Sequence, residues 1–156
     1  ARCLDGDVAW ASINGDVLVL IYAMLCVGTA LDQAGSITLL VSYMLPLLEG
    51  ASPLLLLFIV YFASSALTEA VSNNAVAVIM TPIVIGLGTS LGTDPRPLLI
   101  AVMFAASASF ATPISYQTNT MVYAAGNYRF ADFLRIGLPM NLVVGLVTCL
   151  ALSVLY

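Results

Sequence analysis

A short polar cluster, Thr68-Glu69-Ala70-Val71-Ser72-Asn73-Asn74, is the part of this sequence best suited to bind a ligand. It combines two hydroxyls, two amides and one carboxylate between two strongly apolar runs, 53–62 and 76–85. Polar groups with apolar sequence on both sides are costly to bury unless protein, an ion or a substrate satisfies them. The cluster therefore predicts a binding site rather than a linker.

A second polar stretch, Thr112–Thr120, follows the apolar segment 98–110. Pro113 has no backbone N–H and so favours a break in a helix, and Thr118 or Asn119 is expected to cap the helix that follows. Ser, Thr and Asn in membrane helices often only hydrogen-bond a neighbouring helix. Two breaks in one short chain nevertheless favour a shared site, because broken helices that face a common site recur in secondary transporters.

The two half-helices that meet at such a break suit ions of opposite charge. A half-helix that begins near Ala75, with Asn73 or Asn74 as its N-cap, offers free N–H groups and a positive dipole end to an anion. The half-helix that ends near Thr68 offers free carbonyl oxygens to a sodium ion. Glu69 fits two roles: it lies at an interface or caps a helix end, or it is buried and paired with an Asn or a cation.

The composition is that of an all-α integral membrane protein with several spans. The chain has 156 residues, of which 62% are hydrophobic and 8% are charged, and its mean hydropathy is +1.08. A soluble domain is nearer half apolar and a quarter charged. The net charge of −4 comes from scattered residues, so no nucleic-acid partner is expected.

Enzyme chemistry is not expected. Histidine is absent, which removes the commonest general base and metal ligand. Cys3, Cys26 and Cys149 are far apart and show no metal-binding spacing, and HExxH does not occur. No metal beyond sodium and no organic cofactor is predicted.

The charged residues divide the chain into a short polar start and a long apolar part. Residues 1–15 are interpreted as a polar linker or the end of a preceding domain, and residues 16–156 as a transmembrane transport half. The loop at Arg96 is expected on the opposite side from Arg129 and Arg135. In chain order we expect a hairpin at about 53–90, a broken helix at about 97–125, an interfacial helix at about 128–135 and a last span at 136–156.

The two polar clusters resemble motifs of the divalent-anion/sodium symporter family, which includes dicarboxylate and sulfate carriers. Its members carry Ser-Asn-Thr at hairpin tips, usually after Thr-Glu, and here Asn74 stands in the Thr position. The segment from Pro113 to Asn119 is similar to their second motif, a proline followed by a loop that ends in Asn. Phe110-Ala111-Thr112-Pro113 followed by Tyr-Gln-Thr-Asn looks most like a bacterial branch with TrkA-C-type domains, which is associated with sulfate.

The resemblance implies a fold of two inverted repeats, each with a re-entrant hairpin and a second discontinuous helix. This chain matches the C-terminal repeat, so the implied partners are a missing N-terminal repeat, a second copy in a homodimer, the lipid bilayer, sodium, and a small inorganic or dicarboxylate anion. The implied location is the bacterial inner membrane, with several passes. The implied substrate-binding residues are Ser72, Asn73, Asn74, Thr118 and Asn119, and the implied sodium ligands are Thr68, Val71, Asn73, Thr112 and Ser115.

The function expected from these residues is secondary active transport of a small divalent anion, sulfate-like or dicarboxylate, coupled to sodium. One alternative is an arsenite or other oxyanion carrier, or a proton-coupled carrier in which Glu69 carries the proton. Another is a membrane subunit that does not transport. Tyr116 and Gln117 either belong to the site or only fill the unwound loop.

Overall fold

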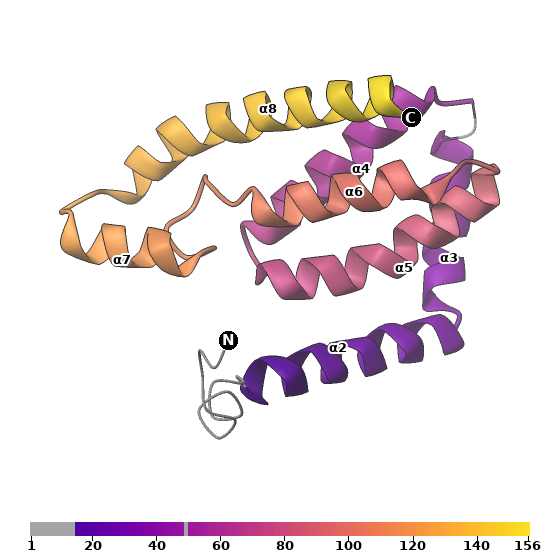
Figure 1. The fold of residues 1–156 in the computed structure, drawn as a ribbon, viewed down its shortest axis with the longest axis horizontal. Helices are drawn as coiled ribbons and strands as arrows, with labels where there is room; N and C mark the ends of the chain where they lie inside the picture. Colours follow the sequence, from indigo (N-terminus) through magenta and orange to yellow (C-terminus); the bar gives the residue numbers. More distant parts are fainter. Residues whose placement is uncertain (1–14, 49) are drawn as a thin grey trace, which may run out of the picture.

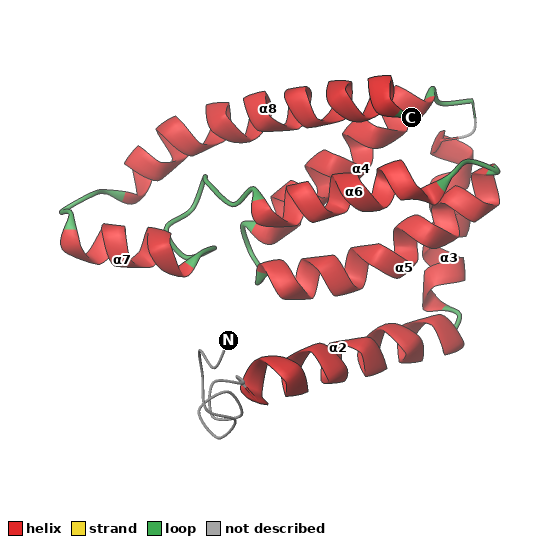
Figure 2. Cartoon of the chain, viewed as in Figure 1, coloured by secondary structure: helices red, strands yellow, loops and turns green. Residues whose placement is uncertain are grey.

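The computed structural model describes residues 15–48 and 50–156, and within them every regular element is a helix (Figures 1 and 2). Most of the predicted linker, residues 1–14, lies outside the described residues, as does Glu49. The helices are α2 (Gly15–Gln33), α3 (Ser36–Leu48), α4 (Pro53–Thr68), α5 (Asn73–Leu91), α6 (Pro95–Ser107), α7 (Gln117–Ala125) and α8 (Phe130–Leu155).

Two of the described helices, α5 and α8, are long and apolar enough to cross a membrane. At 26 residues α8 is about 39 Å long, more than the roughly 30 Å of a bilayer's hydrocarbon core. The segments Ile21–Leu31 and Ser36–Pro46 of α2 and α3 pass the same test only as a pair, with a bend of 65° between them. The apolar helices α4 and α6 are shorter. The predicted class, an all-α membrane protein, is confirmed.

The core forms where α4, α5, α6 and α8 pack together (Figure 1). α4 packs against both α6 and α8, and its Tyr61 side chain is fully buried. In α6, Ala101 and Ala105 are also fully buried, and small side chains of this kind let neighbouring helices approach closely. This packing fixes the ends of α4, α5 and α6 relative to one another, which matters because both polar breaks begin at those ends.

Helix boundaries away from the breaks follow ordinary capping rules. Ser52 caps α4, with its hydroxyl accepting the Leu55 N–H at 3.3 Å and Pro53 in the first helical position. α5 ends at Leu91, and its C-cap Gly92 has a left-handed φ of 67°. Asp94 then caps α6. The connection between α5 and α6 is therefore only three residues long, and it holds the two helices side by side.

The C-terminal part differs from the expected arrangement. An interfacial helix at 128–135 and a separate last span at 136–156 were predicted, but α8 is one continuous helix from Phe130 to Leu155. Its start is fixed by the Asp132 carboxylate, which accepts the Arg129 N–H at 2.8 Å. Pro139 lies inside the helix, where the loss of one N–H donor does not end it. The charged residues near 132–135 therefore belong to the first turns of the long helix.

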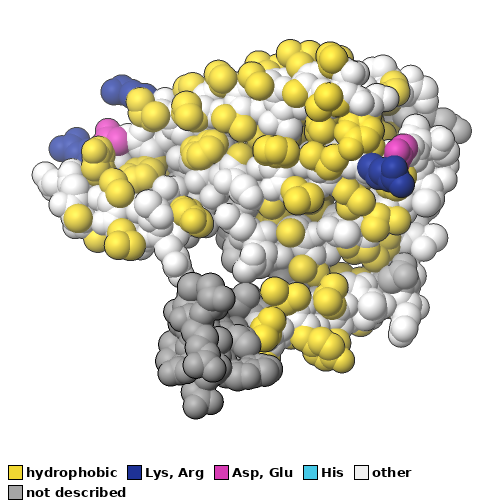
Figure 3. Space-filling model, viewed as in Figure 1, with side chains coloured by type: hydrophobic (Ala, Val, Ile, Leu, Met, Phe, Trp, Pro, Cys, Tyr) yellow, Lys and Arg dark blue, Asp and Glu magenta, His cyan; other side chains and the backbone are white. Residues whose placement is uncertain are grey.

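The charged side chains visible on one face lie near the two ends of the long axis. In Figure 3, dark blue and magenta side chains occur together at each end, and hydrophobic side chains spread between the ends. The turn before α6, which leads to Arg96, is at one end, and the turn before α8, which contains Arg129, is at the other (Figure 1). The two turns thus lie at opposite ends of the molecule, and their placement on opposite sides of a membrane stays a prediction.

Candidate functional site between two broken helices

The first break is the four-residue turn between α4 and α5. Glu69 is the C-cap of α4, and Ser72 is the N-cap of α5, with an extended backbone and a hydroxyl that accepts the Ala75 N–H at 3.4 Å. The predicted caps, Asn73 and Asn74, are instead the first two residues of the helix. The prediction was wrong because the Ser72 hydroxyl accepts the N–H of the third helical residue. Ser72 is therefore the N-cap, and the helix begins at Asn73.

A buried hydroxyl joins the two sides of this break. Thr68 is fully buried, and its Oγ1 lies 2.7 Å from Asn73 Oδ1 and 2.9 Å from the Ala106 carbonyl oxygen. The hydroxyl has one proton, so these two acceptors share it. Thr68 therefore links the end of α4, the start of α5 and the last turn of α6.

The second break is the unwound segment 108–116 between α6 and α7. Its free carbonyls are bound by side chains of the helix that follows. Asn119 Nδ2 donates to Ser109 O at 2.9 Å and to Thr112 O at 3.1 Å, and Thr120 Oγ1 donates to Pro113 O at 2.8 Å. Unwinding removes the helical partners of these carbonyls, and the side chains replace them.

The cap predicted for α7 is absent. Tyr116 occupies the N-cap position and makes no side-chain cap hydrogen bond. Asn119 is not available as a cap because its amide is used on the loop carbonyls. Thr118, the other predicted cap, is the second residue of α7 and is exposed. The loop itself carries a further contact, from the Ser115 hydroxyl to Thr112 O at 3.0 Å.

Glu69 joins the two breaks to each other and to α8. Its Oε1 accepts the Ala111 N–H and the Asn141 Nδ2–H, both at 2.8 Å. Its main-chain carbonyl accepts the Thr112 hydroxyl at 3.2 Å. Parts of both expected roles are present: Glu69 is the C-cap of α4, and its partly buried side chain is paired with an asparagine.

Sequence reasoning missed Asn141, which is 7% exposed. It lies on a stripe of α8 formed by every fourth residue, Gly137, Asn141, Gly145 and Cys149, all of them buried. A β-carbon at position 145 would lie 2.7 Å from the Tyr61 ring, so this stripe allows α8 to approach α4 closely. The sequence did contain a signal for this residue, because Asn141 is the only side-chain amide in the apolar run 136–156.

A hollow of about 280 Å³ lies between the two breaks. The predicted site residues Glu69, Val71, Ser72 and Ser115 line it, together with Ala70, Ile114, Gln117 and Thr120. Gln117 thus belongs to the hollow rather than only filling the loop, and Thr120 was not among the predicted site residues. The lining residues carry hydroxyls and an amide, and Glu69 is the one ionisable side chain among them.

The remaining predicted residues do not line the hollow. Four of them make the hydrogen bonds, described above, within and between the two breaks: Thr68, Asn73, Thr112 and Asn119. Asn74 and Thr118 are exposed, the first in the opening turn of α5 and the second in that of α7. The structure therefore gathers the residues of both sequence motifs around one place.

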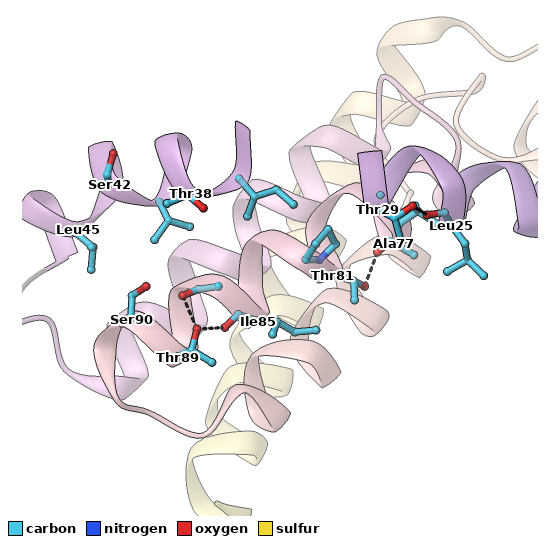
Figure 4. A pocket seen from close by; sticks show the side chains of 16 residues that line it. Leu25, Thr29, Thr38, Ser42, Leu45, Ala77, Thr81, Ile85, Thr89 and Ser90 are labelled. Atoms are coloured by element: carbon cyan, nitrogen blue, oxygen red, sulfur yellow. Dashed lines mark hydrogen bonds between the residues drawn. The ribbon is translucent and has the colours of Figure 1, made fainter. Parts of the chain in front are cut away.

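A larger groove of about 780 Å³ lies between α2, α3 and α5 (Figure 4). Six hydroxyl side chains line it, and four of them bind carbonyls of their own helix. Thr81 donates to the Ala77 carbonyl, and Thr89 lies 2.9 Å from both Ile85 O and Gly86 O. Most of the other lining residues are apolar, so the groove is poorly suited to an anion.

Helices broken at a shared polar hollow, in an apolar all-α chain, are typical of membrane transporters. Comparison with known proteins agrees, and the chain belongs to the citrate transporter family, CitMHS, which it matches over residues 2–156. The family and the relatives below are transporters, so the chain is not an enzyme. Membership of the branch with TrkA-C-type domains stays a prediction.

Three relatives illustrate the match. An uncharacterised transporter of Synechocystis is 40% identical over 154 residues, covering 99% of this chain and 25% of the relative. The uncharacterised transporter YfbS of Escherichia coli is 34% identical over 155 residues, with the same two coverages. Sodium/sulfate cotransporter 1 of Chlamydomonas reinhardtii is 36% identical over 140 residues, covering 89% of this chain and 16% of the relative. The chain thus spans a quarter or less of the length of these relatives.

Proposed function

We propose that the protein containing this chain is a secondary active carrier of a small divalent anion, with sulfate as the first candidate and sodium as the coupling ion. The observation that carries the proposal is the hollow that the two broken helices share, which is lined by hydroxyl and amide groups. The names of the Chlamydomonas relatives, sodium/sulfate cotransporters at 36% identity, support the choice of ions. A dicarboxylate is the second substrate class.

The anion is proposed to bind where α5 and α7 begin. Ser72, Asn73 and Asn74 lie at the first residues of α5, where free N–H groups and the helix dipole favour negative charge. Thr118 brings an exposed hydroxyl from the first turn of α7, and Asn119 supports the anion site by holding the loop carbonyls beside it. The described lining of the hollow contains no arginine or lysine, so neutral donors would select the anion.

Sodium is proposed to bind on the carbonyl side of the same breaks. The end of α4 and the unwound segment supply backbone oxygens, and Thr68, Val71, Asn73, Thr112 and Ser115 are the candidate ligands. Sodium is a hard cation that prefers oxygen ligands of this kind. The positive charge of sodium would offset part of the negative charge of the anion and of the Glu69 carboxylate. Binding of the two ions would therefore be mutually favourable.

The remaining architecture is also part of the proposal. The N-terminal part of the full protein would supply an inverted repeat with the other half of the site, and the two breaks would move together across the membrane to give alternating access. The protein would be a multi-pass homodimer in the bacterial inner membrane. Among the described residues, the two long apolar helices and the shorter ones beside them fit one half of such a carrier.

Uptake by the full-length protein in proteoliposomes tests the proposal. Radiolabelled sulfate, succinate, citrate and arsenite would be compared under an inward sodium gradient and under a pH gradient in sodium-free buffer. We expect sodium-driven sulfate uptake that Asn73→Ala lowers at least tenfold and Ser153→Ala, in the last turns of α8, leaves unchanged.

Other outcomes would overturn defined parts of the proposal. Uptake driven only by the pH gradient would replace sodium by a proton as the coupling ion. Uptake of arsenite or citrate in place of sulfate would replace the substrate. Absence of any uptake by folded protein would favour a membrane subunit that does not transport.

A further inference from the structure

One side chain of the last helix reaches the place where the two breaks meet. Asn141 of α8 is 7% exposed, and its Nδ2 donates to Glu69 Oε1 at 2.8 Å. Among the described side chains of α8, Asn141 alone is hydrogen-bonded to a break. It belongs to neither break and does not line the hollow, so its effect on the hollow passes through Glu69.

The Asn141 amide holds a flexible side chain in one conformation. A glutamate side chain turns about three bonds, and here Glu69 Oε1 accepts N–H groups from two different elements, Asn141 of α8 and Ala111 of the unwound segment. α6 ends at Ser107, so the Ala111 N–H has no helical carbonyl to bind, and the Glu69 carboxyl takes that place. The position of Ala111 therefore depends on the conformation of Glu69.

α8 can hold this amide in place because the helix is fixed on both sides of Asn141. One turn before it, a β-carbon at position 137 would collide with the Phe110 carbonyl, and one turn after it, a β-carbon at position 145 would lie 2.7 Å from the Tyr61 ring of α4. Close contacts of this kind leave little room for a helix to shift or rotate. The amide is therefore presented to Glu69 from a rigid frame.

Stability alone does not explain an amide at position 141. Its Oδ1 is buried and accepts no hydrogen bond from the described residues. A buried acceptor without a donor keeps its desolvation penalty, so an apolar side chain of similar size would be cheaper to bury here. What distinguishes asparagine from such a side chain is the N–H group that binds Glu69.

Two hydrogen bonds to Glu69 connect the two walls of the hollow. Its main-chain carbonyl accepts the Thr112 hydroxyl at 3.2 Å, and its Oε1 accepts the Ala111 N–H at 2.8 Å. Glu69 lines one wall, and Ser115 of the unwound segment lines the other. We propose that Asn141 is a positioning residue that, through Glu69, determines the distance between the two walls and thereby the size of the anion that binds. The effect on anion size rests on the anion site proposed above, whereas the effect on the unwound segment does not.

Amide hydrogen exchange of the full-length protein in nanodiscs tests the positioning role without measuring transport. We expect exchange of the Ala111 amide to become at least tenfold faster in Asn141→Leu, because Glu69 loses the donor that holds it. Cys149→Ala, two turns further along the same buried stripe, is the matched control. It loosens the packing of α8 without removing a hydrogen bond to a break, so it should lower the melting temperature but leave Ala111 exchange unchanged. If Asn141→Leu does not fold, Asn141→Ala removes the same amide and replaces it in every measurement.

Uptake in proteoliposomes tests the consequence for the anion. We expect Asn141→Leu to raise the KM for sulfate at least fivefold with less than a twofold change in kcat, and to lower the preference for sulfate over the longer dianion succinate at least threefold. A purely structural residue would change the amount of active protein but not the KM. The double variant Glu69→Gln, Asn141→Asp exchanges the donor and the acceptor of the contact and keeps one carboxylate. It should therefore recover most of the lost affinity and selectivity.

Two results would overturn the positioning role. One is an exchange rate of the Ala111 amide that Asn141→Leu leaves unchanged, or that Cys149→Ala raises equally. The other is faster exchange with an unchanged KM and unchanged selectivity, which would make Asn141 a structural residue only. If the wild-type protein takes up none of the anions, the proposed transport function fails, and the exchange of Ala111 still decides whether Asn141 positions the unwound segment.

Discussion

Gly137 of α8 lies directly against the main-chain carbonyl of Phe110, in the unwound segment of the second break. A β-carbon at position 137 would collide with that carbonyl and with the α-carbon of Ala111. The absence of a side chain therefore lets the last helix cross the break at backbone distance. The same approach brings Asn141, one turn further along α8, to the Glu69 carboxyl.

Gly137→Ala is expected to destabilise the protein despite the higher helix propensity of alanine. The new methyl group meets backbone rather than a flexible side chain, and overpacking of this kind costs about 1–3 kcal/mol. Gly28→Ala in α2 is the matched control, because its β-carbon would meet only Val78 Cγ1 at 3.8 Å. The apparent melting temperature should fall for the first variant and stay or rise for the second. Equal effects would mean that the close approach is not needed.

Substitutions of Ser72 separate its capping role from its place in the hollow. Ser72→Ala removes the N-cap of α5 and should cost about 1 kcal/mol of stability, whereas Ser72→Asp keeps a capping oxygen but adds a negative charge to the lining. Ser52→Ala removes the equivalent cap of α4, away from the hollow. We expect similar stability losses for both alanine variants, but a raised KM for the anion chiefly in Ser72→Asp. An unchanged KM in that variant would place anion binding elsewhere.

Asn119 and Thr118 are neighbours with different expected roles. Asn119→Ala removes the donor that binds Ser109 O and Thr112 O, so hydrogen exchange should become at least tenfold faster across the unwound segment 108–116. Thr118→Ala removes an exposed hydroxyl and should leave the exchange of that segment unchanged. A rise in KM without faster exchange in Thr118→Ala would support direct substrate contact. Faster exchange in both variants would show that Thr118 too has a structural role.

Thr68→Val tests the hydroxyl that joins three helices. The substitution keeps the shape of the side chain but leaves Asn73 Oδ1 and Ala106 O without their shared donor, at a cost of about 1–3 kcal/mol. Thr89→Val is the control, because its hydroxyl binds only carbonyls of its own helix and is exposed. We expect a lower melting temperature for Thr68→Val alone. If sodium protects wild type from heat and Thr68→Val abolishes that protection, the residue is also a sodium ligand.

The existence of the two breaks could be predicted from local sequence, although the second lies at 108–116, four residues before the predicted stretch Thr112–Thr120. Polar residues between apolar runs, and Pro113 in the second break, indicate where a helix cannot continue in an apolar environment. The signal is strong because an unsatisfied backbone group is so costly there. The all-α class follows from composition for the same reason.

The caps and the role of Asn141 could not be predicted from the motifs. Ser72, Asn73 and Asn74 are all good N-cap residues, and the choice among them depends on backbone angles that the turn sets. Asparagine is a residue type favoured at N-caps, but the free carbonyls of the unwound loop bind the Asn119 amide instead. Asn141 becomes important only because α8 crosses the break, which is a consequence of tertiary packing.

The hydrogen bond between Glu69 and Asn141 joins positions 72 residues apart, and only the first lies in a recognisable motif. When relatives diverge, a replacement of the carboxylate removes the reason to keep an amide on the last helix, and a replacement of the amide leaves the carboxylate without its partner. Substitutions at these two positions should therefore occur together across the family. A comparison restricted to the motifs would show only the change at position 69 and would miss the matching change at position 141.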